Sequence, residues 1–243
     1  MIEIIPAIMP KNFENLNEDL SLVSGLVPLV QIDVMDGAFV PNKTWPYMKS
    51  APGSEPAGDP DFAKILHEEG GFPLWEELDF EADLMVANPG AAAKEWITAG
   101  AKRIILHVES MGDAGAAKAF VQEIKNSLPS RDSFFYTEIG VALNPETSNE
   151  VLEPLMEYID FVQFMGIAKI GFQGQPFDER VLEKISRLRA AHPNVTISVD
   201  GGVNFETAKK LIEAGANRLV IGSAIFESDD IPAAIDEFFH LVS

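Results

Sequence analysis

Cysteine is absent from this chain of 243 residues, which excludes disulfide bonds and thiolate metal ligands. A metal site would have to use carboxylate, imidazole or amide groups. Uninterrupted apolar runs are also short, and none approaches the roughly 18 residues that indicate a membrane-spanning helix. Residues 1–6 lack a basic segment followed by a long apolar core, so the sequence predicts a cytoplasmic protein.

Basic side chains are scarce. The chain has 18 lysine and arginine residues against 38 aspartate and glutamate residues, which gives a formal net charge of −20. This imbalance argues against nucleic acid or an anionic membrane as the main partner. An anionic small molecule is still compatible with it, because backbone N–H groups and helix N-termini bind phosphate without a basic surface.

Hydrophobic patterning is plentiful, and hydrophobic residues make up 47% of the chain. Short apolar runs alternate with segments of helical period. The predicted strands cover residues 2–9, 26–35, 80–86, 103–108, 134–143, 159–165, 195–199 and 218–221. The predicted helices cover residues 12–23, 61–69, 91–99, 114–128, 178–191, 204–214 and 232–241, and a short one opens at 144–147. Eight strand–helix cycles predict an α/β protein with a single (β/α)8 TIM barrel.

No low-complexity linker or shift in composition divides the chain, so we expect one domain over residues 1–243. Residues 43–60 are rich in proline, glycine and serine and fit neither the helical nor the strand period. We predict that they form an insertion over one mouth of the barrel. Trp45 and Tyr47 would then serve a lid or a subunit contact, and the alternative is a surface insertion without a function.

Polar residues interrupt the strand predicted to end near residue 35. Alternation places Gln31, Asp33 and Met35 on one face, while Asp36 points away from Asp33 and is expected to cap a turn. Active sites of this barrel type lie at the C-terminal ends of the strands. The polar residues predicted there are Gln31, Asp33, Asp83, His107, Glu109, Asn144 and Asp200.

Asp33, Asp83 and Asp200 are expected to converge inside one apolar ring. Carboxylates in such a place repel each other and resist ionisation unless a cation or a shared proton is present. The sequence therefore favours a bound divalent metal ion or a proton-transfer site.

Glycines follow the last three predicted strands. The candidate phosphate-binding residues are Gly171, Gly174, Gly201, Gly202, Gly222 and Ser223. Glycine exposes backbone N–H groups, and the loops after the last two strands commonly bind phosphate in this fold. Tight turns would use the same residues, but their position after successive strands predicts a phosphorylated substrate.

Ordered segments along nearly the whole chain match one family pattern. They are Ile32-Asp-Val-Met-Asp-Gly37, Phe39-Val-Pro-Asn42, Leu84-Met85, Asn88-Pro89, His107-Val-Glu109, Gly140-Val-Ala-Leu-Asn-Pro145, Gly171-Phe-Gln-Gly-Gln175, Val199-Asp-Gly-Gly-Val203 and Gly222-Ser-Ala-Ile225. Through these segments the sequence resembles the ribulose-phosphate 3-epimerase family.

The resemblance implies a barrel of the ribulose-phosphate-binding type that inverts carbon 3 of a pentulose 5-phosphate. D-ribulose 5-phosphate would become D-xylulose 5-phosphate through an enediolate, as a step of the pentose phosphate pathway. Asp33 and Asp200 would be the general base and the general acid on opposite faces of that carbon. The family's divalent metal ion would act as a Lewis acid beside them.

The resemblance also places Met35, Met85 and Met165 around the reacting centre, although methionine fills cores equally well. His107 is a candidate for the same substrate pocket. The alternative for His107 and Glu109 is a structural role in a hydrogen-bonded layer.

Several positions depart from the family pattern. Gln31 and Asp83 stand where the family has histidine ligands, and Ala7 replaces a substrate-contacting serine. The loop after the sixth strand carries an additional residue, and Lys169 is new there.

The candidate metal ligands are therefore Gln31, Asp33, Asp83 and Asp200. They form an all-oxygen set, which suits Mg²⁺ or Mn²⁺ better than Zn²⁺. The alternative is that Gln31 and Asp83 hydrogen-bond the catalytic aspartates and that no metal binds.

Two other functions stay open. A sugar-phosphate lyase or synthase of the same barrel type also uses an enediolate and a metal, but such relatives typically place a lysine among the active-site acids, and none of the predicted strand ends supplies one. A catalytically inactive sugar-phosphate-binding protein would need neither Asp33 nor Asp200. Since members of the family commonly assemble, we expect a homo-oligomer.

Overall fold

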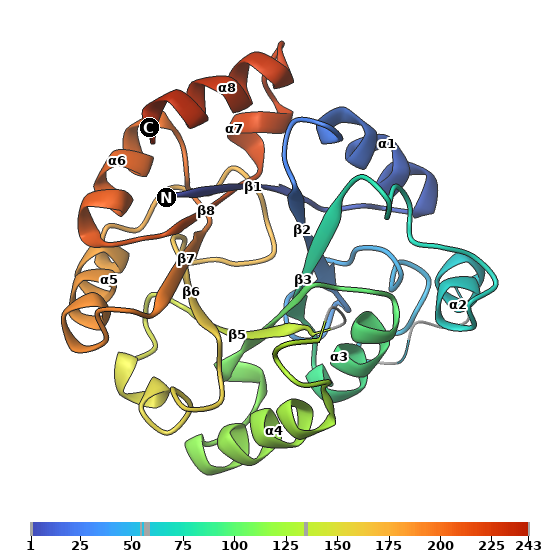
Figure 1. The fold of residues 1–243 in the computed structure, drawn as a ribbon, viewed down its shortest axis with the longest axis horizontal. Helices are drawn as coiled ribbons and strands as arrows, with labels where there is room; N and C mark the ends of the chain where they lie inside the picture. Colours follow the sequence, from blue (N-terminus) through green and yellow to red (C-terminus); the bar gives the residue numbers. More distant parts are fainter. Residues whose placement is uncertain (1, 54, 56–58, 134–135, 243) are drawn as a thin grey trace.

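The barrel consists of parallel strands whose order in space follows their order in the chain (Figure 1). The structure is a computed structural model that describes residues 2–53, 55, 59–133 and 136–242. Within these residues eight strands close into one barrel: β1 (Glu3–Ile8), β2 (Leu29–Met35), β3 (Asp79–Met85), β4 (Arg103–His107), β5 (Glu138–Leu143), β6 (Phe161–Met165), β7 (Thr196–Asp200) and β8 (Arg218–Ile221). The prediction of a single (β/α)8 TIM barrel is confirmed.

The helices surround the barrel on its outside (Figure 1). They are α1 (Phe13–Val23), α2 (Pro60–Leu66), α3 (Pro89–Thr98), α4 (Ala114–Ser127), α5 (Arg180–Ala191), α6 (Phe205–Ala214), α7 (Ser223–Phe226) and α8 (Ile231–Leu241), with two short 3-10 helices, η1 (Val108–Ser110) and η2 (Asn149–Leu152). Among the described residues, no helix is long and apolar enough to cross a membrane.

The helix predicted to open at residues 144–147 is not formed. The backbone N–H of Asn144 and the hydroxyl of Thr147 both donate to Glu109, at 2.9 and 2.5 Å, which fixes a turn there. The short 3-10 helix η2 follows, and Pro154 has no N–H to continue a helical ladder. The second strand also begins later than predicted, because the N–H groups of Leu26 and Val27 still bond to Val23 at the end of α1.

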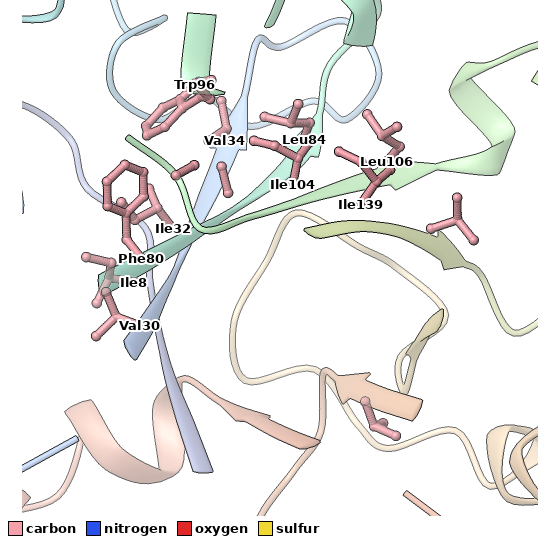
Figure 2. Packing of buried hydrophobic residues seen from close by; sticks show 14 of the residues in the cluster. Ile8, Val30, Ile32, Val34, Phe80, Leu84, Trp96, Ile104, Leu106 and Ile139 are labelled. Atoms are coloured by element: carbon pink, nitrogen blue, oxygen red, sulfur yellow. The ribbon is translucent and has the colours of Figure 1, made fainter. Parts of the chain in front are cut away.

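Successive side chains along a strand alternate between two hydrophobic clusters, one between the barrel and the helices and one inside the barrel. Val30, Ile32 and Val34 of β2 point away from the barrel axis and pack with residues of β3 and with Trp96 of α3 (Figure 2). Met35 lies in a separate cluster with Met85 inside the barrel mouth. The predicted two faces of β2 are thus confirmed, and the inner face carries the polar residues.

Trp45 fills the space between three helices. Its ring lies 5.7 Å from Phe13 of α1, 5.3 Å from Phe62 of α2 and 5.9 Å from Trp96 of α3, measured between centroids. The side chain is buried, and its indole N–H donates to Asp59 at 3.0 Å. Trp45 is therefore a core residue in this structure, and the lid or subunit role predicted for its segment stays a prediction.

Charged residues close the barrel at the amino-terminal ends of the strands. Arg103 pairs with Glu3 and Glu81 at 3.0 Å each and with Glu138 at 3.3 Å. Arg218 pairs with Glu3 at 3.0 Å and Glu138 at 3.1 Å. This network, which we call the floor network, lies at the opposite end of the strands from the predicted site.

Candidate active site

Three carboxylates meet inside the barrel near the carboxyl ends of β2, β3 and β7. Asp33 and Asp200 are 8% and 9% exposed, and Asp83 is fully buried. Each contributes one oxygen atom to a group in which all three oxygens lie within 4.8 Å of one another. The predicted convergence of Asp33, Asp83 and Asp200 is confirmed.

Gln31 connects two of these carboxylates. It lies one inward position before Asp33 on β2 and is fully buried. Its amide nitrogen donates to Asp33 Oδ1 and to Asp200 Oδ2, both at 2.8 Å. The amide oxygen is buried and has no hydrogen-bond partner among the described residues. Gln31 therefore faces the acids with its N–H groups.

Asp83 has partners of its own. His107 Nε2 lies 3.0 Å from Asp83 Oδ1, and the Gln163 amide donates to the other oxygen at 3.5 Å. Ser198 in turn donates to the amide oxygen of Gln163 at 3.1 Å. This buried layer of polar side chains lies below the mouth and orients Asp83.

Burial and mutual repulsion raise the pKa values of Asp33 and Asp200. Burial, followed by the charges of Asp200 and Asp83, raises the pKa of Asp33 well above its ordinary value. Burial and the Asp83 charge raise the pKa of Asp200 to about 7. Burial lowers the pKa of His107, but the carboxylates of Asp83, Glu109 and Asp200 together more than offset this, and the net shift is upward. Near neutral pH, a protonated and an ionised carboxyl group can therefore coexist at the site.

A cavity opens above the acid pair. It spans about 510 Å³ when the space open to solvent is included, and Asp33 and Asp200 are among its lining residues. All of the predicted phosphate-binding residues line the same cavity: Gly171, Gly174, Gly201, Gly202, Gly222 and Ser223. The acid pair and the glycine-rich loops thus share one space.

The close packing of the loops explains two of these glycines. Gly202 has φ +68°, and a Cβ on it would lie 2.9 Å from the Cα of Phe177. Gly171 has φ +85°, and a Cβ there would lie 2.9 Å from Val40. Neither position accepts a side chain without displacing its neighbour.

The predicted pocket residues divide into two groups. Met85 and Met165 line the cavity. Met35 and His107 are buried and are not among the lining residues, so their contact with a ligand stays a prediction. Ile170 from the β6–α5 loop packs against the clusters of both Met35 and Met165.

The expected turn role of Asp36 is confirmed, because its carboxylate accepts from the backbone N–H groups of Ala38, Phe39 and Ala87. Glu109 likewise holds the turn after β5. The structural role predicted as the alternative for Glu109 agrees with these contacts.

Sequence reasoning did not single out Gln163 and Gln173. Gln163 shares the inner face of β6 with Met165, so the alternation that found Gln31 would also have found it. Gln173 lines the cavity, and its amide donates to the carbonyl of Ala7 at 3.4 Å. No strand period applies to Gln173, because it lies in a loop.

The donor set fits a divalent ion. The three carboxylates supply hard oxygen ligands of the kind that Mg²⁺ and Mn²⁺ prefer, and one oxygen of each lies within 4.8 Å of the other two. Gln31 fits as a fourth ligand only with its amide reversed, because its oxygen now points away from the acids.

Comparison with known proteins gives consistent matches over the chain. Residues 72–226 match the ribulose-phosphate 3 epimerase family. A ribulose-phosphate 3-epimerase of Bacillus subtilis (strain 168) is 32% identical over 243 residues, which cover 98% of each protein. The chloroplastic ribulose-5-phosphate-3-epimerase of Arabidopsis thaliana is 34% identical over 239 residues, or 96% of this chain and 75% of that one.

Among solved structures, the 3-hexulose-6-phosphate synthase of Salmonella typhimurium has a TM-score of 0.62 at 12% identity, covering 99% of this chain and 98% of that one. At this identity the likeness shows the fold alone. Together with the sequence relatives, the barrel and its buried acids define an enzyme of the isomerase class, an epimerase. The chain belongs to the ribulose-phosphate 3-epimerase family.

Proposed function

We propose that this protein interconverts D-ribulose 5-phosphate and D-xylulose 5-phosphate by moving a proton at carbon 3. One observation carries the proposal: two largely buried carboxylates, Asp33 and Asp200, line the same cavity as the glycine-rich loops. A pentulose phosphate anchored by its phosphate at those loops would extend its carbon chain toward the acids.

In this mechanism one aspartate removes the C3 proton from one face of the sugar, and the other returns a proton to the opposite face. The two acids come from β2 and β7, so they approach the cavity from different sides of the ring. Because burial and mutual repulsion raise the pKa values of both acids, that of Asp200 to about 7, one acid can start protonated while its partner is ionised. The roles exchange in the reverse direction.

A divalent ion, Mg²⁺ or Mn²⁺ in preference to Zn²⁺, would be held by Asp33, Asp83, Asp200 and the reversed amide of Gln31. When bound, it would stabilise negative charge on the enediolate oxygens. The residues of the chain do the remaining work: the two acids move the proton, and when no ion is bound the Gln31 amide holds them in place through its hydrogen bonds.

The phosphate would bind backbone N–H groups of Gly202, Gly222 and Ser223 at the ends of β7 and β8. This mode needs no basic side chain, which agrees with the net charge of −20. A cytoplasmic place in the pentose phosphate pathway and a homo-oligomeric assembly are part of the proposal. Size-exclusion chromatography with light scattering tests the assembly.

The lyase alternative is less well supported by the site. No lysine lines the cavity within the described ranges, and Lys169 is exposed, with its ammonium 4.7 Å from the ring centroid of Phe172. An inactive binding protein would not require the buried acid pair.

The discriminating experiment follows deuterium from D₂O into carbon 3. Purified protein is incubated with D-ribulose 5-phosphate, with chelator or with Mn²⁺, and the sugar is analysed by NMR spectroscopy. We expect deuterium at carbon 3 together with D-xylulose 5-phosphate. Sugar binding without exchange under either condition would identify a binding protein. Release of a one-carbon fragment from a hexulose 6-phosphate, offered in place of the pentulose, would identify a lyase.

A further inference from the structure

The amide of Gln31 occupies the position that a cation bridging Asp33 and Asp200 would need. A primary amide nitrogen carries two hydrogens, and both are used here, one for each carboxylate at 2.8 Å. The positive end of the amide dipole therefore faces the two acids. A cation that approaches these oxygens meets the N–H groups of Gln31.

Reversal of the amide would exchange its nitrogen and oxygen. The terminal torsion of glutamine is broad and roughly two-fold, so this reversal needs no change in the backbone. It would break both hydrogen bonds to Asp33 and Asp200 and turn the amide oxygen toward them. Without a cation, lone pairs would then face carboxylate oxygens, whereas with a cation the oxygen becomes a ligand.

The amide oxygen is free to make this exchange. It is buried and has no hydrogen-bond partner among the described residues, so no contact of its own holds it in place. Gln163, the other buried amide near the acids, differs on this point. Its oxygen accepts from Ser198, and its nitrogen reaches only Asp83, at 3.5 Å.

We propose that the amide of Gln31 and a divalent cation compete for Asp33 and Asp200. In the metal-free protein Gln31 is the positioning residue that holds the two acids together, and a cation binds only when the amide reverses. The inference rests on the proposed function in naming Asp33 and Asp200 as the reacting pair. The competition itself is a property of binding and does not depend on catalysis.

Metal titrations without substrate test the proposal. We expect Gln31→Glu to bind Mg²⁺ or Mn²⁺ at least tenfold more tightly than the wild type by calorimetry, since changes around metal ligands alter affinity by roughly 10- to 100-fold. Gln163→Glu is the matched control, because it adds the same charge beside the acids and leaves the Gln31 bridge intact. Because Gln163 reaches only Asp83, we expect its replacement to raise the affinity less than Gln31→Glu does.

NMR spectroscopy of the ¹⁵N-labelled wild type gives a second readout. The side-chain amide signals of Gln31, assigned with the Gln31→Glu variant, are expected to shift as Mg²⁺ binds, while those of Gln163 change less. Where Gln31→Glu fails to fold, Gln31→His takes its place, with Gln163→His as its control. We expect Gln31→His to bind Zn²⁺ at least tenfold more tightly than the wild type.

The proposal is overturned if Mg²⁺ binds while the Gln31 signals stay unchanged and Asp83→Asn abolishes that binding. It is equally overturned if the Gln31 variant binds no more tightly than its Gln163 control, or if neither the wild type nor the variant binds any of these ions. Absence of epimerisation alone, with the metal affinities as expected, contradicts the proposed function and leaves the competition standing.

Discussion

At the scale of a single residue, Glu81 shows how burial in the barrel raises the pKa of a carboxyl group. It is 1% exposed and pairs with Arg103 at 3.0 Å, and one of its oxygens has no partner among the described residues. Burial raises its pKa to about 7 from an ordinary value of 4.5, even though Arg103 opposes the shift. Burial likewise raises the pKa values of Asp33 and Asp200 at the mouth, where the hydrogen bonds from Gln31 oppose the shift.

The raised pKa of Glu81 predicts a pH-dependent stability. Between pH 4.5 and 7 the folded protein holds a proton that the unfolded chain releases, so the free energy of unfolding falls as pH rises. We expect the stability of the wild type relative to Glu81→Gln to fall by about 2 to 3 kcal/mol between pH 5 and 8, since a tenfold change in proton affinity corresponds to about 1.4 kcal/mol. Urea denaturation at both pH values measures it, and a constant or rising difference would contradict the account.

The sequence predicts the positions of some site residues, but it does not predict all of their contacts. Asp33 and Asp200 follow from strand alternation together with the rule that barrel sites lie at strand ends. The amide orientation of Gln31 and the pairing of Asp83 with His107 depend on how β2, β3, β4 and β7 are placed around the ring. No local pattern carries that information.

At the scale of elements, the β6–α5 loop connects the site to the rest of the mouth. The carbonyl of Gly171 accepts from the Asn42 side chain at 3.2 Å, and Gly171 itself packs against Val40. Ile170 covers the buried methionines, and Gln173 reaches the end of β1. The loop thus contacts three separate parts of the cavity wall.

Two glycines of this loop offer a matched comparison. Gly171 and Gly174 both have positive φ, but a Cβ on Gly171 would lie 2.9 Å from Val40, whereas a Cβ on Gly174 has no atom within 4 Å. We expect Gly171→Ala to raise KM for the sugar phosphate about tenfold through displacement of the loop, since small misplacements near a site cost up to ~100-fold. Gly174→Ala should raise it less. Equal effects of the two changes would contradict the role given to the Val40 contact.

The elements themselves were largely predictable, because strands and helices of this fold have clear periods and caps. Asn204 illustrates a cap: it accepts from the N–H groups of Glu206 and Thr207 at the start of α6. The turn after β5 was predicted as a helix because Asn144-Pro145 resembles a helix start. Hydrogen bonds to Glu109, which is distant in sequence, hold these residues in a turn instead.

At the scale of the whole molecule, aromatic packing outside the barrel ties the irregular segment before α2 to the core. Its composition predicts an insertion over one mouth of the barrel, and within it Trp45 packs against aromatic rings of three helices. The burial of a large aromatic ring outweighs the local preference of proline and glycine for surface turns.

Trp45 is therefore expected to contribute strongly to stability. Trp45→Ala should lower the free energy of unfolding by about 3 to 5 kcal/mol, as is typical for removal of a buried aromatic side chain. Trp75, which is 64% exposed, is the matched control, and Trp75→Ala should change stability by about 0.5 kcal/mol or less. Chemical denaturation measures both. A loss of similar size in the two variants would argue against the core role of Trp45.

The division of labour between Asp33 and Asp200 is the central claim, and deuterium exchange resolved by epimer tests it most directly. Asp33→Asn and Asp200→Asn are each incubated in D₂O with D-ribulose 5-phosphate and, separately, with D-xylulose 5-phosphate. Asp79→Asn, at the exposed amino end of β3, serves as the control and should behave as the wild type. We predict that each active-site variant loses interconversion by about 10²- to 10⁴-fold. Each variant should still exchange the C3 hydrogen of one of the two epimers. The epimer that exchanges should differ between Asp33→Asn and Asp200→Asn. Loss of exchange from the same epimer in both variants, or wild-type interconversion in either, would contradict the account.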